Sequence, residues 1–153
     1  MKLAEALVLR ADCQRKVAQL KQRLERVMKV QEGEQPAEQP DVLLAELTKT
    51  LDELVVWVKK INKTNSMSPF DQDRSLSDAL AERDGLMQQR NILHDLLEAA
   101  AIKQERFSRS EVKFYRTVDV NVLQKNADEL SKRYREQDFK VQEKNWSTEL
   151  VED

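Results

Sequence analysis

The sequence predicts a mainly all-α protein, an elongated antiparallel four-helix bundle with long helices and one short strand-like segment near residues 109–116. Two observations support the helical class. The chain is 35% charged and 40% hydrophobic, with only two glycines and three prolines, which is typical of long amphipathic helices. Apolar residues also recur at alternating spacings of three and four, the repeat of helices that pack at shallow angles. We therefore expect a single helical domain over residues 1–153.

The first two helices are expected at about 2–28 and 41–64, separated by an acidic, proline-containing linker at 31–40. In the first helix the repeat consists of Leu3, Ala6, Arg10, Cys13, Val17, Leu20, Leu24 and Val27. In the second helix it consists of Leu44, Leu47, Leu51, Leu54, Val58 and Ile61. Because the second helix carries further apolar residues on other faces, we expect it to be covered on more than one side.

The last two helices are expected at about 75–101 and 119–144, the first of them after a loop at 65–74. The third repeat consists of Leu76, Ala79, Arg83, Leu86, Arg90, Leu93, Leu97 and Ala100. The fourth consists of Leu123, Ala127, Leu130, Tyr134, Gln137 and Val141. A second apolar patch on another face near the end of the chain consists of Phe139, Trp146 and Leu150.

Residues 107–118 depart from the helical pattern, because Val112, Phe114 and Val118 alternate with polar residues. Such alternation is typical of a β-strand. The segment contains no Gly, Pro or Asn-Gly turn, so a hairpin of its own is not expected. Its partner is then either residues 29–33 or the same segment of a second subunit, unless it is an extended connector lying on its own bundle.

Pairing with a second subunit has support in the residues themselves. An antiparallel pair centred at Val112 places Glu111 opposite Lys113 of the other subunit. It also places Arg109 opposite Tyr115. The candidate subunit interface comprises Arg109, Glu111, Val112, Lys113, Phe114, Tyr115 and Trp146.

Three arginines, Arg10, Arg83 and Arg90, lie on or beside the apolar repeats. A buried guanidinium without a partner is costly, so each should meet a carboxylate or reach water. We favour a structural salt-bridge layer that sets helix register, and the alternative is a pocket for an anionic ligand. The candidate polar core or ligand cluster comprises Arg10, Glu82, Arg83, Asp84, Arg90 and His94.

No motif predicts catalysis, a metal or a cofactor. His94 is the single histidine, residue 91 is Asn where a di-iron bundle needs Glu, and Cys13 is the single cysteine. A glycine-rich phosphate loop and a zinc-protease helix motif are also absent from the sequence. The sequence favours a non-enzymatic helical protein that self-associates or docks a protein partner. The alternative is an enzyme or anionic-ligand-binding protein with a site between subunits, lined by Arg83, Arg90 and nearby acids.

Charge is unevenly distributed along the chain. Residues 1–30 carry eight Lys and Arg against three Asp and Glu, whereas residues 66–101 carry three against seven. These stretches are complementary, within one chain or between subunits of a homo-oligomer. A nucleic-acid partner is not expected, because the net charge is −2 and the basic stretch lacks interleaved aromatic residues.

The sequence predicts a cytoplasmic protein with no membrane partner. The N-terminal residues form no signal-peptide core, and the longest apolar run, residues 54–58, is far shorter than the ~20 residues of a membrane helix. Pore formation is not expected either, because the chain has no long pair of alternating strands.

Several stretches together resemble an uncharacterised family of short bacterial helical proteins, some members of which carry the label septicolysin. The stretches are MKLAEALVLRAD, KVQEGEQPAEQP, INKTN, LAERDGL, SRSEVKF, TVDV and NWSTEL, and they span essentially the full length. The resemblance implies a bacterial, cytosolic, mostly helical and oligomeric protein without an established activity. It implies no catalytic residues.

Overall fold

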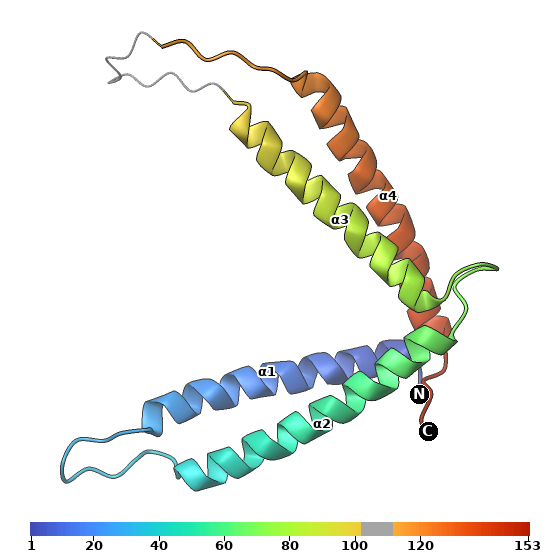
Figure 1. Cartoon of the computed structure of the whole chain (residues 1–153). Helices are drawn as coiled ribbons and strands as arrows, with labels where there is room; N and C mark the ends of the chain where they lie inside the picture. The colour runs from blue at the N-terminus through green and yellow to red at the C-terminus, as the bar shows by residue number, and fades with distance from the viewer. Residues whose placement is uncertain (102–111) are drawn as a thin grey trace. The chain divides into compact units, whose positions relative to one another are not determined.

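The computed structural model describes residues 1–101 and 112–153, and these ranges contain four α-helices (Figure 1). They are α1 (Leu3–Val27), α2 (Pro40–Met67), α3 (Leu76–Ala99) and α4 (Val120–Ser147). The predicted all-α class is confirmed, and the helices pack against each other in antiparallel pairs. Each helix begins and ends within three residues of its expected position.

The chain divides into two compact units. Unit 1 comprises Met1–Ser77 and Gln142–Asp153, and unit 2 comprises Asp78–Val141. Unit 1 therefore contains the α1–α2 hairpin and the last residues of the chain, whereas unit 2 contains nearly all of α3 and most of α4 (Figure 1). The expectation of a single domain stays a prediction.

The turn between α1 and α2 is built from residues suited to it. Gly33 has a φ of 86°, in the left-handed region that residues with a Cβ rarely adopt. Pro40 occupies the first turn of α2, where its missing N–H needs no partner. The two helices can therefore return antiparallel and pack along their length (Figure 1).

The core of unit 1 confirms the α1 repeat and corrects the α2 repeat. In α1, Leu3, Ala6, Cys13, Leu20, Leu24 and Val27 are buried, as expected. In α2, the buried residues are Leu43, Thr50, Ile61 and Thr64. The expected core residues Leu44 and Leu51 are instead 47% and 41% exposed. The α2 repeat is thus confirmed at Leu47 and Ile61, whereas the positions expected at Leu44 and Leu51 shift by one residue to Leu43 and Thr50.

The C-terminal residues close unit 1. Leu3 N–H donates to Thr148 O at 2.9 Å, and Leu150 N–H donates to Met1 O at 2.9 Å. Leu150 is buried, whereas Phe139 and Trp146, which lie seven residues apart on α4, are 69% and 60% exposed. The end of the chain is hydrogen-bonded to its beginning.

Within the single chain, residues 112–117 have no regular secondary structure and Val118 is in a bend. Arg109 and Glu111 lie outside the described residues. Within residues 1–101 and 112–153, the isolated β-bridges are Lys2 to Glu149 and Pro69 to Ser75, and neither involves 29–33 or 112–118. A strand needs a neighbour for its backbone groups, and the described chain does not provide one here. Pairing with a second subunit stays a prediction.

Candidate functional site

A polar layer joins α3 and α4 in unit 2, and Arg83 is at its centre. Arg83 Nη1 donates to Asp138 Oδ1 at 2.8 Å, while Nε and Nη2 donate to Asp84 Oδ1 at 3.1 and 3.0 Å. The Arg83 side chain is only 20% exposed. Burial acts against its charge, but the hydrogen bonds to Asp84 and Asp138 outweigh that effect and raise the pKa of Arg83. The guanidinium is therefore charged and engaged by two carboxylates.

Arg90 lies two turns further along α3 and is bound by neutral groups. Its Nε donates to Ser131 Oγ on α4 at 2.9 Å, and its Nη1 donates to Asn91 Oδ1 at 3.2 Å. Ser131 in turn donates to Ala127 O at 3.1 Å. Arg90 thus helps to join the two helices without a carboxylate partner among the described residues.

The predicted polar cluster is divided between the two units. Arg10 belongs to unit 1, and its Nε is buried without a hydrogen-bond partner in the described chain. The remaining members, all on α3, are Glu82, Arg83, Asp84, Arg90 and His94. Of these, Arg83 and Asp84 are brought together. His94 is half-buried and makes no hydrogen bond or ion pair with any other described residue.

The hollow beside this layer is not suited to an anion. It has a volume of about 390 Å³ and is lined by Asp84, Met87, Gln88, Asn91, Ile92, Asp95 and Tyr134. Neither Arg83 nor Arg90 is in its lining, because their donors are directed to neighbouring side chains. The two aspartates in the lining would repel a negative ligand. Within the described residues no group of three or more His, Cys, Asp or Glu could hold a metal ion.

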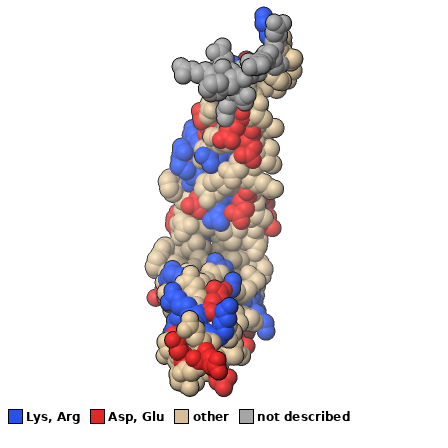
Figure 2. Space-filling model, turned by 90° about the vertical axis from the view of Figure 1, so that its left-hand side faces the viewer, with Lys and Arg blue, Asp and Glu red and all other residues tan. Residues whose placement is uncertain are grey.

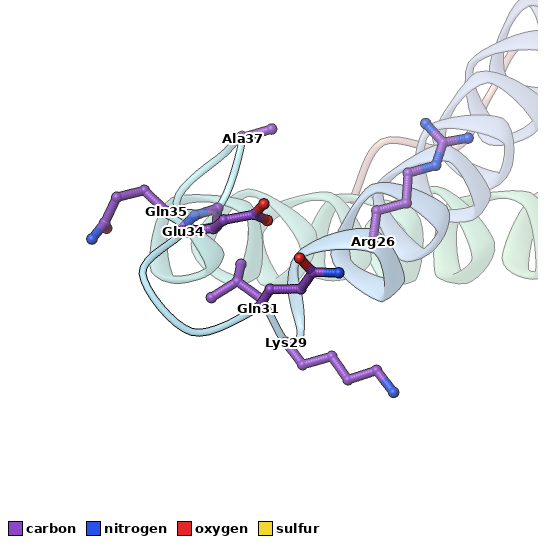
Figure 3. Close-up of a pocket in the computed structure, with 8 residues that line it drawn as sticks. Arg26, Lys29, Gln31, Glu34, Gln35 and Ala37 are labelled. Carbon is purple, nitrogen blue, oxygen red and sulfur yellow. The ribbon is translucent and has the colours of Figure 1, made fainter.

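A second hollow, of about 500 Å³, lies at the loop between α1 and α2 (Figure 3). Its lining includes Arg26, Lys29, Gln31, Glu34 and Gln35, all of them exposed. The long side chains of Arg26, Lys29 and Gln35 extend in different directions in the close-up. Ligand sites need polar groups that converge on one point, so this hollow is a weak candidate.

The basic residues of α1 are largely paired with acids. Lys16 Nζ is 3.2 Å from Glu46 Oε1 on α2, and Arg23 Nε donates to Glu38 Oε2 at 3.0 Å. The hydrogen bonds from Arg23 lower the pKa of Glu38. Arg15 forms an ion pair with Asp12 on the same helix. Positive and negative side chains are interspersed over the face seen in Figure 2, so that face presents no broad basic surface for nucleic acid.

The residues of the predicted subunit interface that the structure describes are exposed. Val112, Phe114 and Tyr115 are 69%, 76% and 80% exposed, and Lys113 is exposed as well. They precede α4 in unit 2, whereas Trp146 near the end of α4 belongs to unit 1. Arg116 Nε donates to Ala100 O at 3.0 Å, which ties this segment to the end of α3.

Part of the apolar repeat that the sequence predicted as the core of α2 is instead a partly exposed face, here called the outer seam. It consists of Leu44, Leu51, Val55 and Val58. Leu44, Leu51 and Val55 are 47%, 41% and 50% exposed, and Val58 is half-buried. Its residues have the spacings of seven, four and three that place them on one side of a helix. The sequence pattern contained this face, but it was interpreted as core.

None of the helices in the described ranges is long and apolar enough to cross a membrane.

Comparison with known proteins establishes the family. The model of a family of unknown function, DUF6847, matches residues 10–150. The chain belongs to this family. The crystal structure of a functionally unknown conserved protein from Corynebacterium diphtheriae is similar, with 43% sequence identity, a TM-score of 0.87, and coverage of 99% of both chains. No curated protein matches.

The DUF6847 match covers nearly the whole chain, including all four described helices except the beginning of α1. The expected membership of an uncharacterised family is thereby confirmed. The septicolysin label appears neither in the description of the family nor in that of the similar structure. Function must therefore be inferred from the chain's own surfaces.

Proposed function

We propose that this DUF6847 protein is a non-enzymatic helical protein that associates with another protein molecule, primarily a second copy of itself. The observation that carries the proposal is the outer seam. Leu44, Leu51 and Val55 expose between 41% and 50% of their surface in a stripe with heptad spacing. Apolar stripes of this kind are the faces that helices bury against one another.

The contrast between the two faces of α2 supports the proposal. The face toward α1 buries two threonines, Thr50 and Thr64, at 2% and 0% exposure. That face also buries Leu43 and Ile61, so the leucines and valines of the outer seam are apolar surface beyond what the hairpin itself covers. Burying apolar surface contributes about 25 cal/mol per Å². A partner that covers the outer seam would bury apolar surface that the α1–α2 hairpin leaves exposed, and this burial would stabilise the complex.

The rival function, an enzyme or an anionic-ligand-binding protein with Arg83 and Arg90 in its site, receives less support. The donors of Arg83 are taken up by Asp84 and Asp138, and Arg90 is held by Ser131 and Asn91. Arginines that bind a ligand are expected to direct free donors into a pocket. These arginines instead fit the structural layer that sets the register of α3 against α4.

Other surfaces are secondary candidates for protein contacts. The opposite charges of residues 1–30 and 66–101 would favour contact between copies of the chain. The exposed aromatic residues Phe114 and Tyr115 are a further candidate, and a Val112→Pro variant tests them. If that variant keeps the wild-type mass in light scattering, the extended segment is not a subunit contact.

The proposal is tested by sedimentation equilibrium of Leu51→Lys beside the wild type. The wild type should show a mass that rises with concentration above the 17.9 kDa of one chain, and Leu51→Lys should remain near 17.9 kDa. Leu96→Lys is the matched control, because Leu96 is a similarly exposed leucine, at 51%, on α3. A wild type that stays at the mass of one chain at every concentration would overturn self-association.

A further inference from the structure

We infer that the middle of the outer seam, from Leu51 to Val58, is covered by the same helix of a second copy, with the two α2 helices antiparallel and Asp52 of each facing Lys59 of the other. The inference rests on the proposed function and adds the orientation and register of the contact. It is drawn from the spacing of the seam, the charges beside it and the geometry of antiparallel helix pairs.

The seam has the dimensions of a short helix-to-helix contact. Leu51, Val55 and Val58 follow one another at spacings of four and three, and the same spacing leads to Thr48 before them and Asn62 after them. Alternating spacings of four and three let side chains of one helix fit between those of another. The polar residues at both ends limit the apolar contact to the middle of α2. A second α2 helix, which has the same short apolar middle, matches it in length.

Two unpaired charges lie beside the seam. Asp52 follows Leu51 and Lys59 follows Val58, so helical geometry places both on the flank away from α1. Both are exposed, and neither forms an ion pair with any other described residue. Glu46 and Lys60 of the same helix, by contrast, are paired within the chain: Glu46 with Lys16 at 3.2 Å, and Lys60 with Glu152 at 3.2 Å.

The two charges lie seven residues apart, about 10 Å along the helix, which is too far for them to pair with each other. Antiparallel helices bring the same flank of both partners together, so Asp52 and Lys59 can meet their opposites in a second copy. In a parallel pair this flank would instead meet the opposite flank, where Leu47 and Leu54 carry no charge. The charges therefore favour the antiparallel arrangement.

The charges of Asp52 and Lys59 also distinguish one register of the two α2 helices from the neighbouring registers. When Val55 of each copy packs against Val58 of the other, the two-fold axis passes between Val56 and Trp57, and Lys59 of the second copy is the charge on the facing flank nearest to Asp52, offset by two residues. Sliding the helices by one heptad in either direction would place Asp52 against Asp52, or Lys59 against Lys59. Like charges at such positions disfavour a register.

In this register Val55 packs against Val58 of the second copy, on both sides of the axis. The apolar contact is short, and exposed ion pairs add little affinity, so the dimer should form at micromolar or higher concentration. The charges then select the register more than they create the affinity. The arrangement predicts a closed two-chain assembly, because a two-fold contact uses the same surface of both copies.

A charge exchange tests the inference. Asp52→Lys and Lys59→Asp should each weaken dimerisation by about tenfold, since each converts two attractive pairs into two repulsive ones. The double variant with both exchanges restores opposite charges and should dimerise within about threefold of the wild type. Lys49→Asp is the control, because Lys49 is an exposed lysine of α2 on another face. Dissociation constants would come from sedimentation equilibrium, with circular dichroism melts to verify that each variant is folded.

The outcomes separate the register from the proposed function. If the wild type dimerises but both single exchanges bind like the wild type, the Asp52 to Lys59 register is wrong and self-association stands. A double variant as weak as the single ones would also contradict the register. A wild type that remains a single chain would overturn the proposed function and this inference together.

Discussion

Arg83 on α3 and Asp138 on α4 are joined by a hydrogen bond of 2.8 Å between Nη1 and Oδ1, with their side chains 20% and 26% exposed. This pair lies where a leucine would be expected in a helix-to-helix repeat. An arginine held by a carboxylate across the hairpin tolerates one register of α3 against α4, whereas apolar side chains would tolerate several. We assign it a structural role.

Replacing Asp138 with alanine should lower the free energy of unfolding by about 1 kcal/mol, because Arg83 would lose its partner on α4. The effect is limited by partial exposure of the pair and by Asp84, which still binds the guanidinium. Urea unfolding measures it, with Glu136→Ala, an exposed residue of α4, as control. Equal stabilities of the two variants would argue against the structural role.

Thr64 connects α2 to the last residues of the chain. Its hydroxyl accepts a hydrogen bond from Val151 N–H at 2.9 Å and donates to Lys60 O at 2.8 Å. Thr64→Val should therefore destabilise the protein by about 1–2 kcal/mol more than Thr50→Val. Thr50 is a matched control because it is also buried and donates to Glu46 O, but accepts no such bond. Similar losses in both variants, measured by urea unfolding, would contradict this role.

Glu149 makes the stability of unit 1 depend on pH. Hydrogen bonds from Lys2, at 2.5 Å, and then from the Met1 amine lower the pKa of Glu149. Because its pKa is lower in the folded state, its stabilisation is present above the unfolded pKa of about 4.3 and is lost as the pH falls through the folded value.

A Glu149→Gln variant should accordingly melt below the wild type at neutral pH, and the difference should shrink as the pH falls below the unfolded pKa of about 4.3. Circular dichroism melts across this range test it, with Glu143→Gln, an exposed residue of α4, as control. A difference that stays constant with pH would mean that the Glu149 charge does not stabilise the fold.

Cys13 should react slowly with thiol reagents. Burial is the main reason that its pKa is raised, followed by the negative charges of Glu53 and Asp12. We expect its reaction with Ellman's reagent to be at least about 100-fold slower in the native protein than in urea, because the reagent reaches the buried sulfur only when α1 opens and the raised pKa reduces the thiolate fraction. A cysteine at exposed Ala18, in a Cys13→Ser background, provides the fast reference. Comparable rates would show that α1 opens readily.

The helices were predictable because each repeat continues through many turns, but the choice between two faces of α2 was not. Leu44 and Leu51 are more hydrophobic than Thr50 and Thr64, so hydrophobicity alone favours the wrong face. A threonine can be buried in a helix when its hydroxyl donates to the carbonyl four residues earlier, as Thr50 does at 2.8 Å. The sequence pattern does not reveal that compensation.

Two other differences arise from contacts between distant residues. The arginine at position 83 was expected to need an acid, but its partner on α4, Asp138, depends on the register of the hairpin. The alternation at residues 112–118 indicated a strand, yet a strand also requires a neighbouring strand, which local sequence does not specify. Local pattern therefore predicted the elements better than their partners.

A native mass spectrum of the protein, purified without added ligand, tests the central claim most directly, because it reports the number of chains and any bound small molecule together. We predict a two-chain species of twice the 17.9 kDa chain mass, with no bound molecule, which dissociates on dilution. A single chain that carries a small anionic molecule would contradict self-association through α2 and would favour a ligand-binding function.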